Sequence, residues 1–204
     1  MADQLTLVIG SRRYSSWSLR PWLLLKQAGA AFDQVEIALR QPDTKAEILK
    51  WSPSGKVPLL VAGPLKIWDS LAICEYVAEM FPALWPADPA ARAVARAVAA
   101  EMHSGFQALR QACPMDVAAH TPMAEVPAEV AADVARINAL WIDCRTRFGA
   151  NGPFLFGDFS VADAMFAPVV TRYLTYDLPA EGAAAAYLRT IADLPAMKEW
   201  AAGA

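Results

Sequence analysis

Three serines near the N-terminus, Ser15, Ser16 and Ser18, stand shortly before Pro21. Proline lacks an amide hydrogen and clashes with the carbonyl four residues back, so it is harmless only in the first turn of a helix. We therefore predict a helix that begins near Ser18, with Ser15 and Ser16 in the loop before it. Unpaired amides and the positive end of the helix dipole favour an anion at such a place.

The other reactive side chains give few options for metal or redox chemistry. The three cysteines, Cys74, Cys113 and Cys144, are far apart and form no CxxC pair, and the sequence has only two histidines. These numbers argue against a disulfide framework and against a zinc site, so no metal is expected. The formal net charge of -3 gives no reason to expect a nucleic-acid partner, which normally needs a basic face.

Strand and helix signals alternate in the first 80 residues. Residues 5–9 form a short apolar run that predicts a buried strand, and a helix ending near Gly29 follows it. Val35, Ile37 and Leu39 alternate with other residues as in a second strand, after which we expect an irregular segment. Residues 57–61 and 65–67 predict a hairpin.

A helix is then expected to open at Asp69-Ser70, and the chain after it differs in character. Residues 81–89 contain three prolines, which predict a linker, whereas the alanine-rich segment 90–119 favours helix. Apolar residues three and four apart between 126 and 148 predict another helix, and Ser160 and Asp163 form a variant capping box before a further one. We therefore expect an α/β domain over residues 1–82 and an all-α domain over residues 89–204.

No apolar run approaches the roughly 20 residues of a membrane helix. The start Met1-Ala2-Asp3 lacks the basic and apolar stretches of a secretory signal. We therefore expect a cytoplasmic protein without a membrane partner.

Four motifs, in order along the chain, resemble those of the glutathione transferase family. Residues 14–20, Tyr-Ser-Ser-Trp-Ser-Leu-Arg, resemble the serine motif of zeta-like members, and residues 55–59 resemble the family's loop with a cis proline. Residues 69–73 resemble its acidic-Ser-x-Ala-Ile signature, and residues 156–163 its capping motif in the helical domain. The resemblance implies a thioredoxin-like glutathione-binding domain, an all-helical C-terminal domain, glutathione as co-substrate and a homodimer.

The resemblance assigns thiol activation to Ser15, with Ser16 as the alternative. Lowering the pKa of a thiol from about 8.5 by about 2 units needs roughly 2.7 kcal/mol of preference for the thiolate. A serine hydroxyl supplies about 1.5–3 kcal/mol of this and a helix terminus up to about 1 kcal/mol. Neither a histidine nor a metal is required. Capping of the helix by these serines, with no catalytic role, is the structural alternative.

The resemblance also implies how glutathione is held. Lys56 would meet the glycyl carboxylate, Val57 would pair with the peptide backbone, and Pro58 would shape that edge. Ser70 and the amides beside it would take the γ-glutamyl carboxylate, while Asp69 would face the ammonium. Residues expected near the second substrate are Trp17, Arg172 and Tyr176.

The expected activity is attack of the activated thiol on a small hydrophobic electrophile. A glutathione-dependent isomerase of maleylacetoacetate type is an alternative, although Trp17 replaces the cysteine that the zeta-like motif carries there. A non-catalytic glutathione-binding module is the other alternative.

Overall fold

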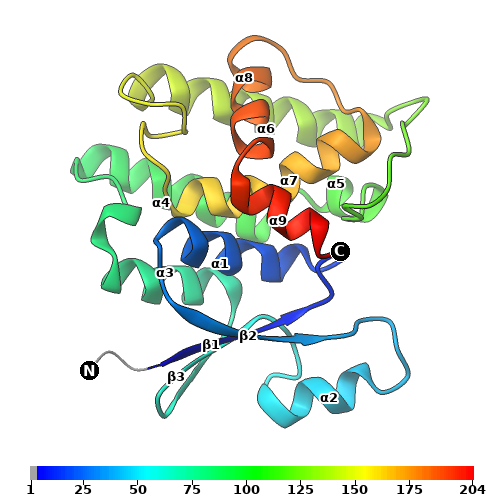
Figure 1. Cartoon of the computed structure of the whole chain (residues 1–204). Coiled ribbons are helices and arrows are strands. Elements are labelled where there is room, and N and C mark those ends of the chain that lie inside the picture. The colour runs from blue at the N-terminus through cyan, green and yellow to red at the C-terminus, as the bar shows by residue number, and fades with distance from the viewer. Residues whose placement is uncertain (1–3) are drawn as a thin grey trace.

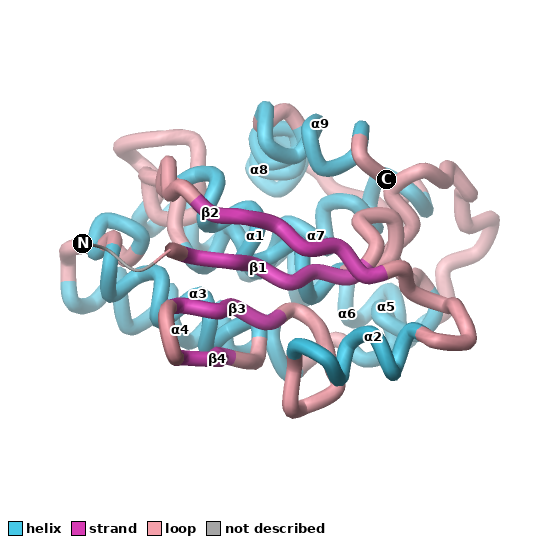
Figure 2. The backbone as a smooth tube through the Cα atoms, turned by 60° about the horizontal axis from the view of Figure 1, so that its bottom comes forward, coloured by secondary structure: helices cyan, strands magenta, loops and turns pink. Residues whose placement is uncertain are grey.

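A four-stranded mixed sheet is the base on which the first part of the chain is built. The computed structural model describes residues 4–204, so Met1, Ala2 and Asp3 lie outside the described residues. Within this range the elements begin with β1 (Leu5–Gly10), α1 (Ser16–Gln27), β2 (Phe32–Ile37), α2 (Thr44–Trp51), β3 (Leu59–Ala62), β4 (Leu65–Ile67) and α3 (Ser70–Met80). The strand order is β2-β1-β3-β4, with β2 parallel to β1 and the other pairs antiparallel, as Figure 2 shows.

Both faces of the sheet are covered, because successive side chains of a strand point to opposite faces. Leu7 and Ile9 of β1 belong to the large core that the sheet shares with α1 and α3. Val8, between them, packs with Ile37 and Ile48 in a small core beneath α2. Figure 1 shows α1 and α3 on one side of the sheet and α2 on the other.

The segment between β2 and β3 contains a helix, so the prediction of an irregular connection was wrong. It contains α2, whose only fully buried side chain is Ile48, whereas Leu49 is half exposed. One buried residue leaves almost no apolar periodicity to detect. The helix start is fixed locally, since the Thr44 hydroxyl donates to the carbonyl of Ala38 at 2.7 Å and accepts from the amide of Gln41 at 3.0 Å.

The first helix begins earlier than predicted. Ser15 is its N-cap and Ser16 its first residue, so only Ser15 precedes the helix and Pro21 lies inside it. The helix starts two residues before the position expected from Pro21, because Ser15 caps it there: the Ser15 side chain accepts a hydrogen bond from the amide of Ser18. Burial compensates for the hydrogen bond lost at Pro21, since Trp22, Leu23 and the residues around them are fully buried.

The second part of the chain is all helical, as predicted. After a short 3-10 turn at Pro82–Leu84 come α4 (Pro89–Ser104), α5 (Gln107–Ala112), α6 (Ala128–Phe148), α7 (Val161–Tyr176), α8 (Gly182–Ala192) and α9 (Pro195–Ala202). The alanine-rich segment 90–119 is not one helix, because the chain breaks at Gly105 and Phe106, where Phe106 has a left-handed φ of 62°. The exact boundaries at residues 82 and 89 stay a prediction.

Helix α7 forms the buried centre of the helical part and packs directly on α1, α4 and α8. Its predicted capping box is present: the Asp163 carboxylate accepts from the amide and hydroxyl of Ser160 at 2.8 and 2.9 Å. It also accepts from the amide of Leu155 at 3.1 Å. Burial raises the pKa of Asp163 to about 6, against the opposing effect of these donors.

The last helix returns to the start of the chain. The Trp200 indole donates to the carbonyl of Arg12 at 2.9 Å, and Lys26 pairs with Glu199 at 2.8 Å. Figure 1 shows the C-terminus beside the loop that follows β1. The two parts of the chain therefore share one continuous core.

Candidate functional site

A cavity of about 340 Å³ lies where the start of α1, the loop before β3 and the start of α3 meet α4. Ligand cavities typically have volumes of about 300–1,000 Å³. Six of the residues predicted for the site line this cavity: Trp17, Lys56, Val57, Pro58, Asp69 and Ser70. Ser54, Trp68 and His103 line it as well. Residues far apart in the sequence thus line a single cavity.

The loop before β3 supplies one side of the cavity. The Val57–Pro58 peptide bond is cis, as the resemblance implies. Pro58 is buried, whereas Val57 is partly exposed and Lys56 exposed. Gly55 has a φ of 63°, a conformation that favours glycine, and its carbonyl accepts from Lys45 at 3.0 Å. Val57 and Lys56 therefore both line the cavity, with Lys56 the more exposed of the two.

The start of α3 supplies the second side. Asp69 is its N-cap, and one carboxylate oxygen accepts from the amides of Leu71 and Ala72 at 3.0 and 3.2 Å. Its other oxygen lies 2.8 Å from Nε2 of His103 on α4. The Ser70 hydroxyl is buried and has no hydrogen-bond partner among the described residues. Nδ1 of His103, which also lines the cavity, is likewise buried without a partner among the described residues. Buried polar atoms without a partner are costly, so Ser70 and His103 are the groups here that a ligand would satisfy.

The start of α1 is where the serines lie. The Ser15 hydroxyl accepts from the amide of Ser18 at 3.3 Å and donates to the hydroxyl of Ser18 at 2.7 Å. The latter also accepts from the amide of Gly10 at 3.1 Å. Ser15 and Ser16 are both buried, and of the three consecutive residues only Trp17 lines the cavity. Ser15 therefore caps the helix in this structure, and its hydroxyl would have to turn from Ser18 to reach a ligand.

Two guanidinium groups lie close to the Trp17 ring. The guanidinium carbons of Arg20 and Arg110 lie 4.3 and 4.8 Å from the centre of its ring. The His103 ring meets it edge-on at 5.5 Å. The indole therefore stands between the cavity and a positively charged region inside the protein.

Arg172 and Tyr176 are not brought to this cavity. The Arg172 Nε donates to the carbonyl of Cys113 at 2.8 Å, and the Tyr176 hydroxyl donates to that of Pro114 at 2.9 Å. Both residues of α7 thus fasten the chain that follows α5. Their contact with a second substrate stays a prediction.

Sequence reasoning did not select Trp68, His103 or Arg20 as site residues. His103 lies on α4, more than 30 residues after the aspartate that it contacts, so no local pattern connects the two. Arg20 is part of the serine motif, but only the structure shows that it is completely buried. An arginine among the apolar residues of α1 was the available signal.

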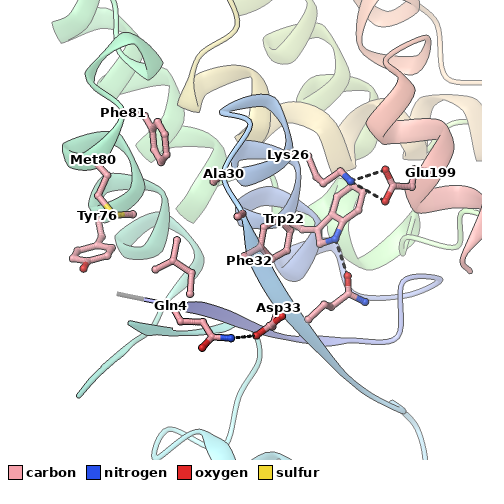
Figure 3. A pocket seen from close by; sticks show the side chains of 13 residues that line it. Gln4, Trp22, Lys26, Ala30, Phe32, Asp33, Tyr76, Met80, Phe81 and Glu199 are labelled. Carbon is pink, nitrogen blue, oxygen red and sulfur yellow. Dashed lines mark hydrogen bonds and ion pairs between the residues drawn. The ribbon is translucent and has the colours of Figure 1, made fainter. Parts of the chain in front are cut away.

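A larger hollow, of about 950 Å³, opens between α1, α3 and the free edge of β2. Figure 3 shows two pairs among the polar side chains that line it, Lys26 with Glu199 and Gln4 with Asp33. The Trp22 indole donates to the side-chain oxygen of Gln34 at 2.9 Å. These six side chains are thus engaged with one another, whereas the smaller cavity contains the Ser70 hydroxyl, which has no partner among the described residues, so we place the functional site in the smaller cavity. Residues 4–204 contain no group of three or more His, Cys, Asp and Glu side chains that could hold a metal ion.

The fold and cavity together define a protein with the glutathione transferase fold. A model of the family described as glutathione S-transferase, N-terminal domain, matches residues 14–80. This N-terminal region therefore belongs to that family, and it contains three of the four motifs named above.

Comparison with individual proteins agrees. A probable maleylacetoacetate isomerase from Caenorhabditis elegans is 37% identical over 100 residues, which cover 48% of this chain and 46% of that protein. The chain thus spans about half the length of this curated relative. A glutathione transferase homologue from Burkholderia, crystallised with bound glutathione, superposes with a TM-score of 0.72 at 22% identity, covering 97% and 96% of the two chains. Glutathione transferase Omega 2S from Trametes versicolor, in complex with 2,4-dihydroxybenzophenone, gives 0.71 at 25% identity, covering 98% and 94%.

Proposed function

We propose that this protein is a glutathione transferase, which activates the thiol of glutathione for attack on a small electrophile. One observation carries the proposal: a single cavity joins Trp17 at the start of α1, the cis-proline loop, and the start of α3 with its unpartnered Ser70 hydroxyl. The bound glutathione in the Burkholderia structure of the same fold supports it.

Glutathione is an extended peptide with two carboxylates and one ammonium group. In the proposed complex its backbone pairs with Val57 beside Pro58, and the γ-glutamyl carboxylate accepts from the Ser70 hydroxyl at the positive end of α3. Asp69 faces the ammonium, and His103 holds the aspartate in place from the other domain. Lys56, at the exposed rim, meets the glycyl carboxylate.

This placement directs the cysteinyl sulfur toward the start of α1. The amides and dipole of the helix favour the thiolate there, and the Ser15 hydroxyl donates to it after turning from Ser18, with Ser16 as the alternative donor. Trp17 forms the apolar wall that a second substrate meets. We propose Arg172 and Tyr176 only as more distant contacts of a long substrate.

The test is a titration of the thiol of bound glutathione, followed by its thiolate absorbance, together with conjugation of 1-chloro-2,4-dinitrobenzene. We expect a pKa below that of free glutathione and catalysed conjugation. A bound thiol with an unshifted pKa and no conjugation would reduce the protein to a glutathione-binding module.

A second candidate is a glutathione-dependent isomerase of maleylacetoacetate type. It is favoured by the name of the Caenorhabditis elegans relative and by the serine motif, whereas Trp17 stands where that motif has a cysteine. Isomerisation of a cis-diketo acid with no net consumption of glutathione would identify it.

We also propose a cytoplasmic homodimer with a role in detoxification. An exposed edge strand supports the dimer: β4 is the last strand of the sheet, and its Leu65 is about half exposed. None of the helices within residues 4–204 is long and apolar enough to cross a membrane. Sedimentation at micromolar concentration that shows only a 22.1 kDa species would contradict the dimer.

A further inference from the structure

Arg20, in the middle of α1, has no solvent exposure. Its Nε, Nη1 and Nη2 atoms are all buried without a hydrogen-bond partner among the described residues. A guanidinium carries five N–H donors and keeps its charge in proteins. Such a group is rarely buried without an acceptor, because an uncompensated charge in the interior is strongly unfavourable.

The groups around Arg20 do not supply the missing counter-charge. Burial is the main cause that lowers its pKa, and the positive charges of Arg110 and Arg172 lower it further. Cys74 and Asp69 act in the opposite direction. Burial raises the pKa of the Cys74 thiol far above neutrality, so that it stays uncharged.

The Asp69 carboxylate is already engaged by two amides and by His103. The other two arginines do have acceptors. Arg110 donates to the carbonyls of Gly105, Met102 and His103, and Arg172 donates to that of Cys113. Arg20 is therefore the member of this cationic group that has donors to offer, and it lies directly behind the Trp17 indole.

Trp17 connects Arg20 to the glutathione cavity. Its ring lines that cavity, is 38% exposed, and covers the guanidinium at 4.3 Å. A rotation of this one side chain would open a path from the cavity to the donors of Arg20. A second cation also lies close to the indole, since the guanidinium carbon of Arg110 is 4.8 Å from the ring centre.

We propose that Arg20 binds a carboxylate of the second substrate, so that the protein acts preferentially on acidic electrophiles. This inference rests on the proposed function and names its substrate class. A carboxylate matches the fork of the guanidinium and would provide the acceptors that Arg20 lacks. Glutathione carries carboxylates too, but Lys56 and the start of α3 already offer donors for both of them.

The experiment compares 4-chloro-3-nitrobenzoate with its methyl ester as substrates. In both, the glutathione sulfur forms a bond to the ring carbon and chloride leaves with the bonding electrons, while the carboxyl group is unchanged. We expect wild-type kcat/KM to favour the acid over the ester, and Arg20→Met to reduce the acid-to-ester ratio by about 10- to 100-fold, the usual value of a charge-assisted hydrogen bond. Arg20→Lys should keep part of the preference. Arg147→Met, at an exposed arginine on α6, is the matched control and should keep all of it.

Equilibrium binding makes the test independent of catalysis. The unreactive 3-nitrobenzoate should bind the glutathione-loaded protein at least about 10-fold more weakly after Arg20→Met, and its binding should quench fluorescence less in Trp17→Phe than in wild type. A wild-type preference for the ester, or an unchanged ratio and unchanged benzoate affinity in Arg20→Met, would overturn the inference. A loss of glutathione affinity with benzoate affinity unchanged would assign Arg20 to glutathione and overturn it too. If neither substrate is conjugated while benzoate still binds through Arg20, the proposed function fails and the acid site stands.

Discussion

Replacement of Ser15 by alanine separates a catalytic serine from a capping serine. The Ser15 hydroxyl accepts from the amide of Ser18 and donates to the hydroxyl of Ser18. Loss of the N-cap alone should lower the free energy of unfolding by about 1 kcal/mol. If Ser15 also binds the glutathione thiolate, the rate of conjugation should fall as well.

The size of that fall follows from the geometry. A bond from serine to a thiolate is worth about 1.5–3 kcal/mol, but the hydroxyl must first give up its bond to Ser18, which is worth about 1 kcal/mol. The net preference of about 0.5–2 kcal/mol predicts a loss of roughly 2- to 30-fold in turnover at pH 7. The deficit should shrink at higher pH, where the thiol ionises without help.

The assay is the pH–rate profile with 1-chloro-2,4-dinitrobenzene, measured beside urea unfolding. Ser16→Ala is the neighbouring control, because Ser16 is equally buried and no side-chain hydrogen bond holds it in the described structure. Reduced stability with an unchanged profile would show that Ser15 only caps α1. A shifted pH–rate profile in Ser16→Ala alone would show that Ser16 activates the thiol. If neither variant shifts the profile, the backbone amides activate it.

The remaining predictions concern two buried or capping carboxylates. Asp69→Asn keeps an acceptor for the cap of α3 but removes the charge, so glutathione affinity measured by calorimetry should fall by about 2–3 kcal/mol, and an unchanged affinity would take Asp69 out of the site. Asp163→Ala leaves the amides of Ser160 and Leu155 without an acceptor and should destabilise the fold by about 2–4 kcal/mol, whereas the exposed Asp143→Ala should change it by less than about 0.5 kcal/mol. Because the pKa of Asp163, about 6, lies above that of an unfolded chain, about 3.9, the folded protein binds the extra proton between about pH 4 and pH 6. The unfolding free energy should therefore fall by about 3 kcal/mol as pH rises through this window, and Asp163→Ala should flatten that slope.

The helices and strands that could be predicted from the sequence are those that are determined by a local pattern of residues. The strand at residues 5–9 is buried on both faces, and the capping box of Ser160 and Asp163 is a local pattern, so both were visible. Helix α2 was missed because it buries one side chain and is held by the bonds of Thr44 instead. The start of α1 was misplaced because proline propensity is a weaker constraint than a buried cap.

The residues of the candidate site also divide into those that a local motif predicts and those that only the tertiary structure shows. Residues 55–58 and 69–70 were found because they belong to short motifs that also shape the backbone around them. His103 and Arg20 were not found, since their importance depends on what packs against them from other helices. The roles of all these residues toward glutathione stay predictions.

The contacts of His103 and Trp17 show why the two parts of the chain must act together. His103 reaches from α4 to the aspartate that caps α3, and Trp17 on α1 lies against Arg110 of α5. The helical part therefore fixes one carboxylate of the proposed glutathione site and sets the charge behind the proposed second-substrate wall. A change in α4 or α5 can thus alter substrate preference without touching any residue of the glutathione motifs. In the proposed function the motifs of the N-terminal region bind glutathione, whereas the cations from the helical part set the specificity for the second substrate.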